Sequence, residues 1–295
     1  MNFQKSSNML LTKRGKVHDI YEPIGKKKLY YPRRKPYNYI SIFTSDRVSA
    51  FDRYIADIPN KGLSMDQISK WWFSQTKEIV PNHVLNDTID QYLLTRKCKV
   101  FPIEFVMRAY LTGTTKTSIW KNYEKGIRNY CGYSLPDDMT KNQQLPEVIL
   151  TPTTKGETDI PISEEEIIKQ GLMTKEQFEI CKEYSYKLFE VGQTISDNNG
   201  LTLVDTKYEF GIDQYGEIVL VDELHTPDSS RYWAKGPKNH RSFDKEILRK
   251  YISSKYEDPY DLNQEIYIPK PIVNEISQTY VHLYHAITGK WDYNV

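Results

Sequence analysis

The chain has 295 residues, 40 basic and 39 acidic side chains and a formal net charge of +1, a length that fits one large domain or two closely packed lobes. This charge balance excludes an overall electrostatic preference for nucleic acid or for an acidic membrane surface. Three widely spaced cysteines and the lack of any membrane-length apolar run favour a cytoplasmic protein without a disulfide framework and without a membrane partner.

The first third of the chain is predicted to be mostly β-structure. Apolar or alternating runs at 16–22, 29–31, 39–44 and 98–107 indicate short strands. Gly15 leads into the first run with Lys16 and His18 on one face, an arrangement suited to nucleotide phosphates, although basic residues at a strand start are more often simply solvated. Ser64 and Gln67 have the spacing of a capping box, which predicts one helix running to Pro81.

The segment 100–114 is an apolar strand that ends in a turn of small residues. Glu104 and Arg108 have the same strand parity, so they project from one face. One interpretation is that the two charges neutralise each other in the core. The other is that the turn Thr112-Gly113-Thr114 offers hydroxyl and amide donors to a phosphate beside Arg108.

The segment 132–161 is rich in proline and small polar residues, which predicts a long surface loop. Two capping-box patterns follow it, Ser163 with Glu166 and Thr174 with Gln177. The second opens a run of apolar residues at helical spacing and predicts a long amphipathic helix. Near the end of the chain, a similar spacing up to Gly289 predicts a last helix with a glycine cap.

Residues 201–221 have the pattern of a hairpin with its turn at 213–216. Asp205, Lys207 and Glu209 share one face of the first strand. A four-residue loop from Gln214 to Glu217 would place Glu209 opposite Asp222, about 5 Å away, and two such carboxylates favour a Mg²⁺ ion with nucleotide phosphates between them. The alternative is a solvated face of an edge hairpin.

The segment 224–233, which follows the hairpin, combines hydroxyls, a carboxylate and an arginine with two aromatic residues. Arg231 has the forked geometry that suits a phosphate. A surface ion pair between Arg231 and Asp228 is about as probable from the local sequence. Strands in the first part and helices in the later part indicate the α+β class.

Two long segments resemble the SAICAR synthetase family, the phosphoribosylaminoimidazole-succinocarboxamide synthases. Residues 100–114 resemble the family's Pro-x-Glu to Arg-x-x-x-Thr-Gly-Ser stretch, and residues 203–211 resemble its Val-Asp-x-Lys-x-Glu-Phe-Gly stretch. Similarity also extends over 15–21, 44–52, 59–62, 150–161 and 222–233 in the family's order. The length and inserts resemble the longer, fungal-type branch.

The resemblance implies a two-lobed α+β fold, SAICAR-synthase-like and related to ATP-grasp, with antiparallel sheets and packed helices. A β-rich nucleotide-binding lobe is expected over residues 1–112, and an α+β lobe with the substrate and metal site over 113–295. The implied activity is that of an ATP-dependent carbon-nitrogen ligase of purine biosynthesis. It would condense carboxyaminoimidazole ribonucleotide (CAIR) with L-aspartate through an acyl phosphate, with ATP and Mg²⁺, as a monomer or homodimer.

Roles for individual residues also follow from the resemblance. Catalysis is expected of Asp205, Lys207 and Arg231. ATP is expected to contact Gly15, Lys16, His18 and Lys155. CAIR is expected to contact Glu104, Arg108, Thr114, Lys207, Asp228 and Arg231. Magnesium is expected at Asp159, Glu209 and Asp222, and a possible substrate loop contains Ser49 and Asp52.

Two positions depart from the family pattern. His18 stands where the family usually has arginine or lysine, so a permanently charged phosphate contact becomes one that titrates near pH ~6.5. We therefore expect ATP affinity to depend modestly on pH, and a His18→Arg variant to change that pH profile. Thr114 replaces the usual serine and keeps its hydroxyl.

Two other functions deserve comparison with the ligase. A small-molecule or lipid phosphotransferase would also use a glycine-bearing β lobe, a lysine and metal-binding carboxylates, but the chain has neither an Asp-Phe-Gly nor a His-Arg-Asp motif. A nucleotide- or RNA-binding module is the other alternative, prompted by basic clusters at 26–28 and 33–35. A requirement for L-aspartate in ADP release separates ligase from kinase, and salt-dependent RNA binding without ATP turnover would indicate the module.

Overall fold

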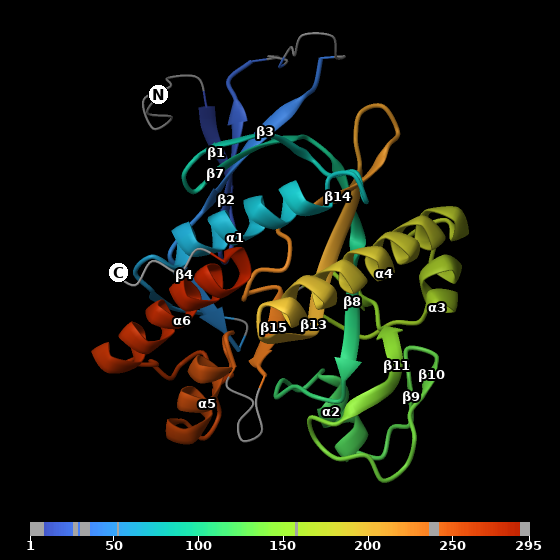
Figure 1. Cartoon of the computed structure of the whole chain (residues 1–295), viewed down its shortest axis with the longest axis vertical. Helices are drawn as coiled ribbons and strands as arrows, with labels where there is room; N and C mark the ends of the chain where they lie inside the picture. Colours follow the sequence, from blue (N-terminus) through green and yellow to red (C-terminus); the bar gives the residue numbers. More distant parts are fainter. Residues whose placement is uncertain are drawn as a thin grey trace.

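The computed structural model describes residues 9–25, 29, 36–51, 53–156, 159–235 and 242–289. Two antiparallel sheets form the centre of this part of the chain, and helices pack against them (Figure 1). The expected α+β class with antiparallel sheets and packed helices is confirmed. In these ranges, every helix is too short or too polar to cross a membrane.

The first sheet has five strands in the order β1-β2-β3-β7-β6. Their bounds are Met9–Arg14 for β1, His18–Pro23 for β2, Tyr39–Thr44 for β3, Tyr92–Arg96 for β7 and Val84–Ile89 for β6. The strands predicted at 16–22 and 39–44 are confirmed to within two residues. Of the run predicted at 29–31, only residue 29 lies in the described ranges, and Leu29 forms an isolated bridge with Tyr37.

A hairpin and a helix connect β3 to β6: β4 (Arg47–Ala50), β5 (Arg53–Asp57) and α1 (Lys61–Thr76). The helix is present as predicted, but the capping box at Ser64 and Gln67 is wrong. The helix begins four residues earlier, after Asn60 with φ 64°, and a carboxylate oxygen of Asp46 accepts a hydrogen bond from the Gly62 N–H at 2.8 Å. A side chain distant in sequence therefore satisfies the helix start.

The second sheet contains the site. Its strand order is β11-β8-β13-β14, with β12 paired to β8 and β15 paired to β13. The bounds are Gln144–Leu150 for β11, Lys99–Tyr110 for β8, Leu201–Ile212 for β13, Ile218–Val221 for β14, Thr153–Thr154 for β12 and Ser230–Ala234 for β15. The predicted hairpin at 201–221 is confirmed. The predicted long loop at 132–161 is wrong in part, because β11 and β12 extend this sheet; Pro146 is tolerated because β11 is an edge strand.

Helix α4 (Lys175–Asn198) packs along β8 and β13 (Figure 1). The buried residues Phe178 and Leu188 of α4 join the core on this face, and the ring of Phe105 lies 5.4 Å from that of Phe178. The capping box of Thr174 and Gln177 is confirmed at the start of α4. Ser163 likewise caps the short helix α3 (Glu164–Lys169).

The remaining elements are α2 (Ile119–Glu124), β9 (Asn129–Tyr130), β10 (Tyr133–Ser134), α5 (Glu246–Lys255) and α6 (Lys270–Thr288). Gly289, with φ 69°, ends α6 as predicted. Helices α5 and α6 bury Leu248, Ile276 and Tyr280 against Met65 of α1 and against the β4–β5 hairpin. The division of the chain into two lobes at residue 112 stays a prediction. Helices α5 and α6, which come late in the chain, share a core with α1 and the β4–β5 hairpin, which come early.

Candidate functional site

The three charged side chains of β13 are central to the site. The register pairs Asp205 with Arg108 and Glu209 with Glu104 of β8. The Lys207 ammonium lies 2.8 Å from a carboxylate oxygen of Glu104 and 2.8 Å from one of Glu209. Although burial alone would lower it, these two carboxylates raise the pKa of Lys207 well above its ordinary value. Lys207 is therefore a fixed positive charge between two carboxylates.

The carboxylate pair has further partners on its other side. Lys155, in the segment after β12, forms an ion pair with Glu209. The Thr153 hydroxyl donates to Glu104 at 3.2 Å. The negative charges of Glu104 and Glu209 are thus shared between two lysines and a hydroxyl, an arrangement that stabilises buried charge.

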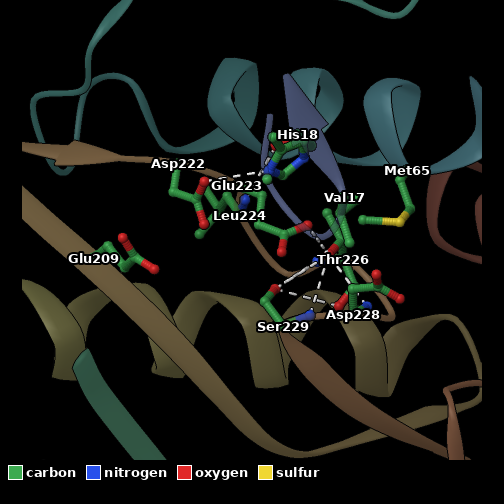
Figure 2. Close-up of polar contacts among 12 residues, drawn as sticks. Val17, His18, Met65, Glu209, Asp222, Glu223, Leu224, Thr226, Asp228 and Ser229 are labelled. Carbon is green, nitrogen blue, oxygen red and sulfur yellow. Dashed lines mark hydrogen bonds and ion pairs between the residues drawn. The ribbon is translucent and has the colours of Figure 1, made fainter. Parts of the chain in front are cut away.

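The expected hairpin register is wrong by one residue. Glu209 lies opposite Val221 rather than Asp222, because the turn contains five residues between the Ile212–Ile218 pair. Asp222 comes after β14 with φ 67°. It faces β2 instead, where a ring nitrogen of His18 lies 3.4 Å from a carboxylate oxygen of Asp222 (Figure 2). Glu209 lies on β13, the strand that pairs with β14.

His18 and Asp222 influence each other's protonation. Burial favours the neutral form of both, but the hydrogen bond between them raises the pKa of His18 above its ordinary value. The same contact with His18 lowers the pKa of Asp222, and the charges of Lys207 and Lys155 lower it further. Asp222 is therefore ionised, and its carboxylate interacts electrostatically with the ammonium groups of Lys207 and Lys155.

Two guanidinium groups share the carboxylate of Asp205. Arg231 of β15 forms an ion pair with Asp205, and Arg108 of β8 lies 3.5 Å from it. Arg108 also donates to the Thr151 hydroxyl at 2.7 Å. The surface pair between Arg231 and Asp228 is absent from the described part of the chain; Asp205, Asp244 and Glu246 all interact with Arg231, and Arg231 and Arg108 together present two guanidinium groups to an anion.

Some of these side chains line one cleft of about 190 Å³, whereas His18, Lys155, Glu209 and Asp222 are not among the residues that line it. Of the predicted site residues, the cleft is lined by Glu104, Arg108, Asp159, Asp205, Lys207, Asp228 and Arg231. A neighbouring cleft of about 170 Å³ shares Arg231 and contains Thr114, whose hydroxyl lies 3.3 Å from Glu246 of α5. The predicted CAIR residues are thus brought together by β8, β13, β15 and the loop before β15.

The glycine-bearing loop before β2 is held by a tight network. The Gly15 N–H donates to the carbonyl of His18 at 2.8 Å, and a Cβ at residue 15 would lie only 2.6 Å from that carbonyl oxygen. Arg47 donates to the Gly15 carbonyl at 3.1 Å and forms an ion pair with Asp19. Lys16 lies in this loop.

Of the predicted substrate loop, Ser49 lies in β4 opposite Tyr54 of β5. Asp52 lies outside the described residues. Sequence reasoning missed Lys61, Lys245 and Tyr280, which surround the carboxylate of Asp228. Lys61 precedes the helix start predicted at Ser64, and its available signal was the segment 59–62 that resembles the family, but only the packed structure identifies its partner.

The carboxylates of the site include oxygen donors of the kind that Mg²⁺ prefers. In the described ranges, no group of three or more His, Cys, Asp or Glu side chains is arranged to hold a metal ion by itself. Magnesium, however, is commonly held by one or two carboxylates together with waters and substrate phosphates. Glu209 on β13 and Asp222 just after β14 offer carboxylate oxygens of this type, so the residues fit a nucleotide-bound Mg²⁺ rather than a protein cage.

An α+β fold with a cleft lined by carboxylates, lysines and arginines is typical of an enzyme that binds phosphate groups. Residues 11–264 match the SAICAR synthetase family model. The chain belongs to the SAICAR synthetase family, as the segments 100–114 and 203–211 predicted. The branch within the family stays a prediction.

Curated relatives carry the same family name. The chain is 44% identical over 285 residues to the chloroplastic phosphoribosylaminoimidazole-succinocarboxamide synthase of Arabidopsis thaliana, spanning 94% of this chain and 66% of that protein. It is 43% identical to the synthase of Legionella pneumophila (strain Paris), spanning 94% of this chain and 87% of the relative. The structure of the Saccharomyces cerevisiae SAICAR synthase complexed with SAICAR matches with a TM-score of 0.79 and 29% identity over 98% of both chains.

Proposed function

We propose that this chain is an ATP-dependent ligase that condenses CAIR with L-aspartate to give SAICAR, ADP and phosphate in purine biosynthesis. Family membership and the synthase names of relatives with more than 40% identity support this activity. The observation in the structure that carries it is the cleft lined by Glu104, Lys207 and the Arg108–Asp205–Arg231 cluster, next to which Lys207 joins Glu104 to Glu209. In this proposal the arginine cluster would bind the phosphate, and the Lys207 end would receive the reacting carboxylate.

The Arg108–Asp205–Arg231 cluster would hold the ribonucleotide 5′-phosphate. Two guanidinium groups oriented by one carboxylate form a preorganised anion site, and the hydroxyl of Thr114 lies in the adjoining cleft that shares Arg231. Asp205 would set the orientation of both arginines rather than contact the phosphate. This arrangement would fix the distance from the phosphate to the reacting end of CAIR.

The reaction would proceed at the Lys207 end of the cleft. The CAIR carboxylate oxygen attacks the γ-phosphorus of ATP, the bond from γ-phosphorus to the β–γ bridging oxygen breaks, and ADP leaves. The amine of L-aspartate then attacks the acyl carbon and displaces phosphate. Lys207, fixed between Glu104 and Glu209, would neutralise charge on the CAIR carboxylate, while Gly15, Lys16, His18 and Lys155 would contact ATP phosphates.

Glu209 and Asp222 would hold Mg²⁺ together with nucleotide phosphates and water, while Asp159, which lines the cleft, is a further ligand only by family resemblance. When bound, the ion would neutralise the nucleotide phosphates. Lys155, at Glu209, would bring a second positive charge to the same phosphates. Cys98, Cys131 and Cys181 are free thiols, which fits a reducing compartment such as the cytoplasm.

The function is tested by incubating the full chain with MgATP, CAIR and L-aspartate. We expect SAICAR and ADP in equal amounts, with ADP release dependent on both CAIR and L-aspartate. Continuous turnover to ADP with CAIR but without L-aspartate, together with a stable phosphorylated product in equal amount, would instead indicate the phosphotransferase. Failure to form SAICAR with all three substrates would refute the proposal.

A further inference from the structure

The carboxylate of Asp228 is the meeting point of three helices. Lys61 from the first turn of α1 lies 2.9 Å from its Oδ2 atom, and Lys245, at the start of α5, lies 3.0 Å from the same atom. The hydroxyl of Tyr280 in α6 donates to Oδ1 at 2.5 Å. Side chains separated by more than 200 positions therefore converge on one residue of the cleft.

Lys61 is an unusual residue at this place. Its side chain is fully buried, at 0% exposure, and its other close polar neighbour is the sulfur of Met65 at 2.9 Å. Moving an ammonium group out of water costs several kcal/mol, and buried ion pairs replaced by apolar residues are often as stable. Stability alone is therefore a weak reason for a lysine here, particularly because Lys245 already neutralises Asp228.

Asp228 retains capacity for a ligand. Burial would raise its pKa, but the charges of Lys245 and Lys61 lower it, so the carboxylate is ionised. The two ammonium groups within 3.0 Å of Oδ2 and the Tyr280 hydroxyl on Oδ1 are three donors, whereas an ionised carboxylate can accept about four hydrogen bonds. Asp228 nevertheless lines the cleft. An ionised, buried acceptor held at the wall of a cleft suits a hydroxyl donor of the ligand.

We propose that Lys61 and Tyr280 are positioning residues that fix the Asp228 carboxylate so that it accepts a hydrogen bond from a ribose hydroxyl of the ribonucleotide. The inference rests on the proposed function, because that function supplies the ribonucleotide. Lys61 and Tyr280 do not line the cleft and act through Asp228. Figure 2 shows the Asp228 side chain near Met65, the thioether neighbour of Lys61 in α1.

The test compares Lys61→Met with a matched control, Lys70→Met. Lys70 lies on the same helix in a largely buried ion pair with Asp66, and it has no contact with Asp228. Thermal unfolding first establishes that both variants are folded. We expect Lys61→Met to raise the KM for CAIR about tenfold, the loss of one charge-assisted hydrogen bond, and to change the KM for ATP less than about twofold. Lys70→Met should leave both KM values unchanged.

A second measurement separates positioning from general structural damage. CAIR is compared with its 2′-deoxy and 3′-deoxy analogues, and wild type should prefer CAIR over at least one of them about tenfold. Lys61→Met should lose most of this preference. Tyr280→Phe, which removes only a hydroxyl, should reduce it about threefold and keeps the test valid if Lys61→Met does not fold.

The outcomes separate this inference from the proposed function. Absence of SAICAR with the wild type refutes the proposed function itself. An active wild type in which the folded variants keep the preference for CAIR over the deoxy analogues refutes the positioning role alone. An equal rise in KM for ATP and CAIR in Lys61→Met and Tyr280→Phe, with the preference retained, would likewise show a purely structural role.

Discussion

At the scale of single residues, the site depends on lysines that lie between carboxylates. Glu104 and Glu209 are opposite each other on adjacent strands, where like charges directly opposed destabilise a sheet. The ammonium group of Lys207, at 2.8 Å from both, removes this repulsion. The sequence showed the three charges of β13 but not this bridge, because Glu104 reaches Lys207 through a pairing between strands about 100 residues apart.

The first prediction concerns Glu209→Gln. The substitution keeps the size of the side chain and removes a negative charge, so Lys155 loses its ion-pair partner and the proposed Mg²⁺ loses a ligand. We expect kcat to fall at least about 100-fold while the chain stays folded. Steady-state kinetics over a range of Mg²⁺ concentrations, with circular dichroism, provides the measurement.

Glu217→Gln is the control for this prediction. Glu217 lies at the other end of the same hairpin, half exposed, and pairs with Arg96 away from the cleft. Its substitution should change kcat less than about twofold, since exposed ion pairs contribute little. Full activity of Glu209→Gln would contradict the role assigned to Glu209.

At the scale of elements, the start of α1 is held unusually close to the end of β3. A Cβ on Gly62 would lie 2.6 Å from the carbonyl oxygen of Thr44. The Gly62 N–H also donates to Asp46, next to Arg47, which anchors the Gly15 loop. Glycine is therefore needed for close approach of the backbones, although alanine would be the better residue for a helix interior.

Gly62→Ala tests this contact. Alanine should gain about 1 kcal/mol of helix propensity, but overpacking against a backbone carbonyl typically costs about 1–3 kcal/mol and requires α1 to shift. We expect a net destabilisation of about 1 kcal/mol in urea unfolding and a higher KM for ATP. Ser74→Ala, at an exposed position of the same helix, should change stability by less than about 0.5 kcal/mol. A Gly62→Ala protein more stable than wild type would contradict the contact.

Local signals predicted the elements better than their pairing. The caps at Ser163, Thr174 and Gly289 were found because each depends on residues within a few positions. The start of α1 was missed because its cap, Asp46, lies 16 residues away. The Glu209–Asp222 register failed for a related reason: a turn one residue longer than expected moves every cross-strand neighbour by one.

In the candidate site too, local signals predicted which residues matter better than which residues they contact. Alternation placed Asp205, Lys207 and Glu209 on one face, and the structure brings all three together. Strand parity and the turn at 112–114 also indicated Arg108, which lies beside Asp205, and the resemblance to a family then assigned it to CAIR. Lys61 was not predicted, because buried lysines are rare and only tertiary contacts distinguish one from a solvated lysine of the same local sequence.

At the scale of the whole molecule, two buried neutral histidines link stability to pH. His83 and His225 are almost fully buried, and burial lowers the pKa of each to about 3. Below about pH 6.5 the unfolded chain binds a proton at each histidine that the folded chain does not. The free energy of unfolding should therefore fall as pH decreases from 6.5, approaching about 1.4 kcal/mol per pH unit for each histidine.

A His83→Gln variant isolates this effect. Other groups titrate with the opposite sign: burial raises the pKa of Asp66, Glu223 and Asp244, which bind protons more readily in the folded chain. The raised pKa of His18 acts in a different window, stabilising the fold below it and losing that effect as pH rises through it. These contributions cancel in the difference between variant and wild type. Urea unfolding at pH 7, 6 and 5 should show wild type losing more stability than His83→Gln, by about 1 kcal/mol between pH 6 and 5. Equal losses in the two proteins would mean that His83 is protonated in the folded state at these pH values, which its buried position does not allow without a large conformational change.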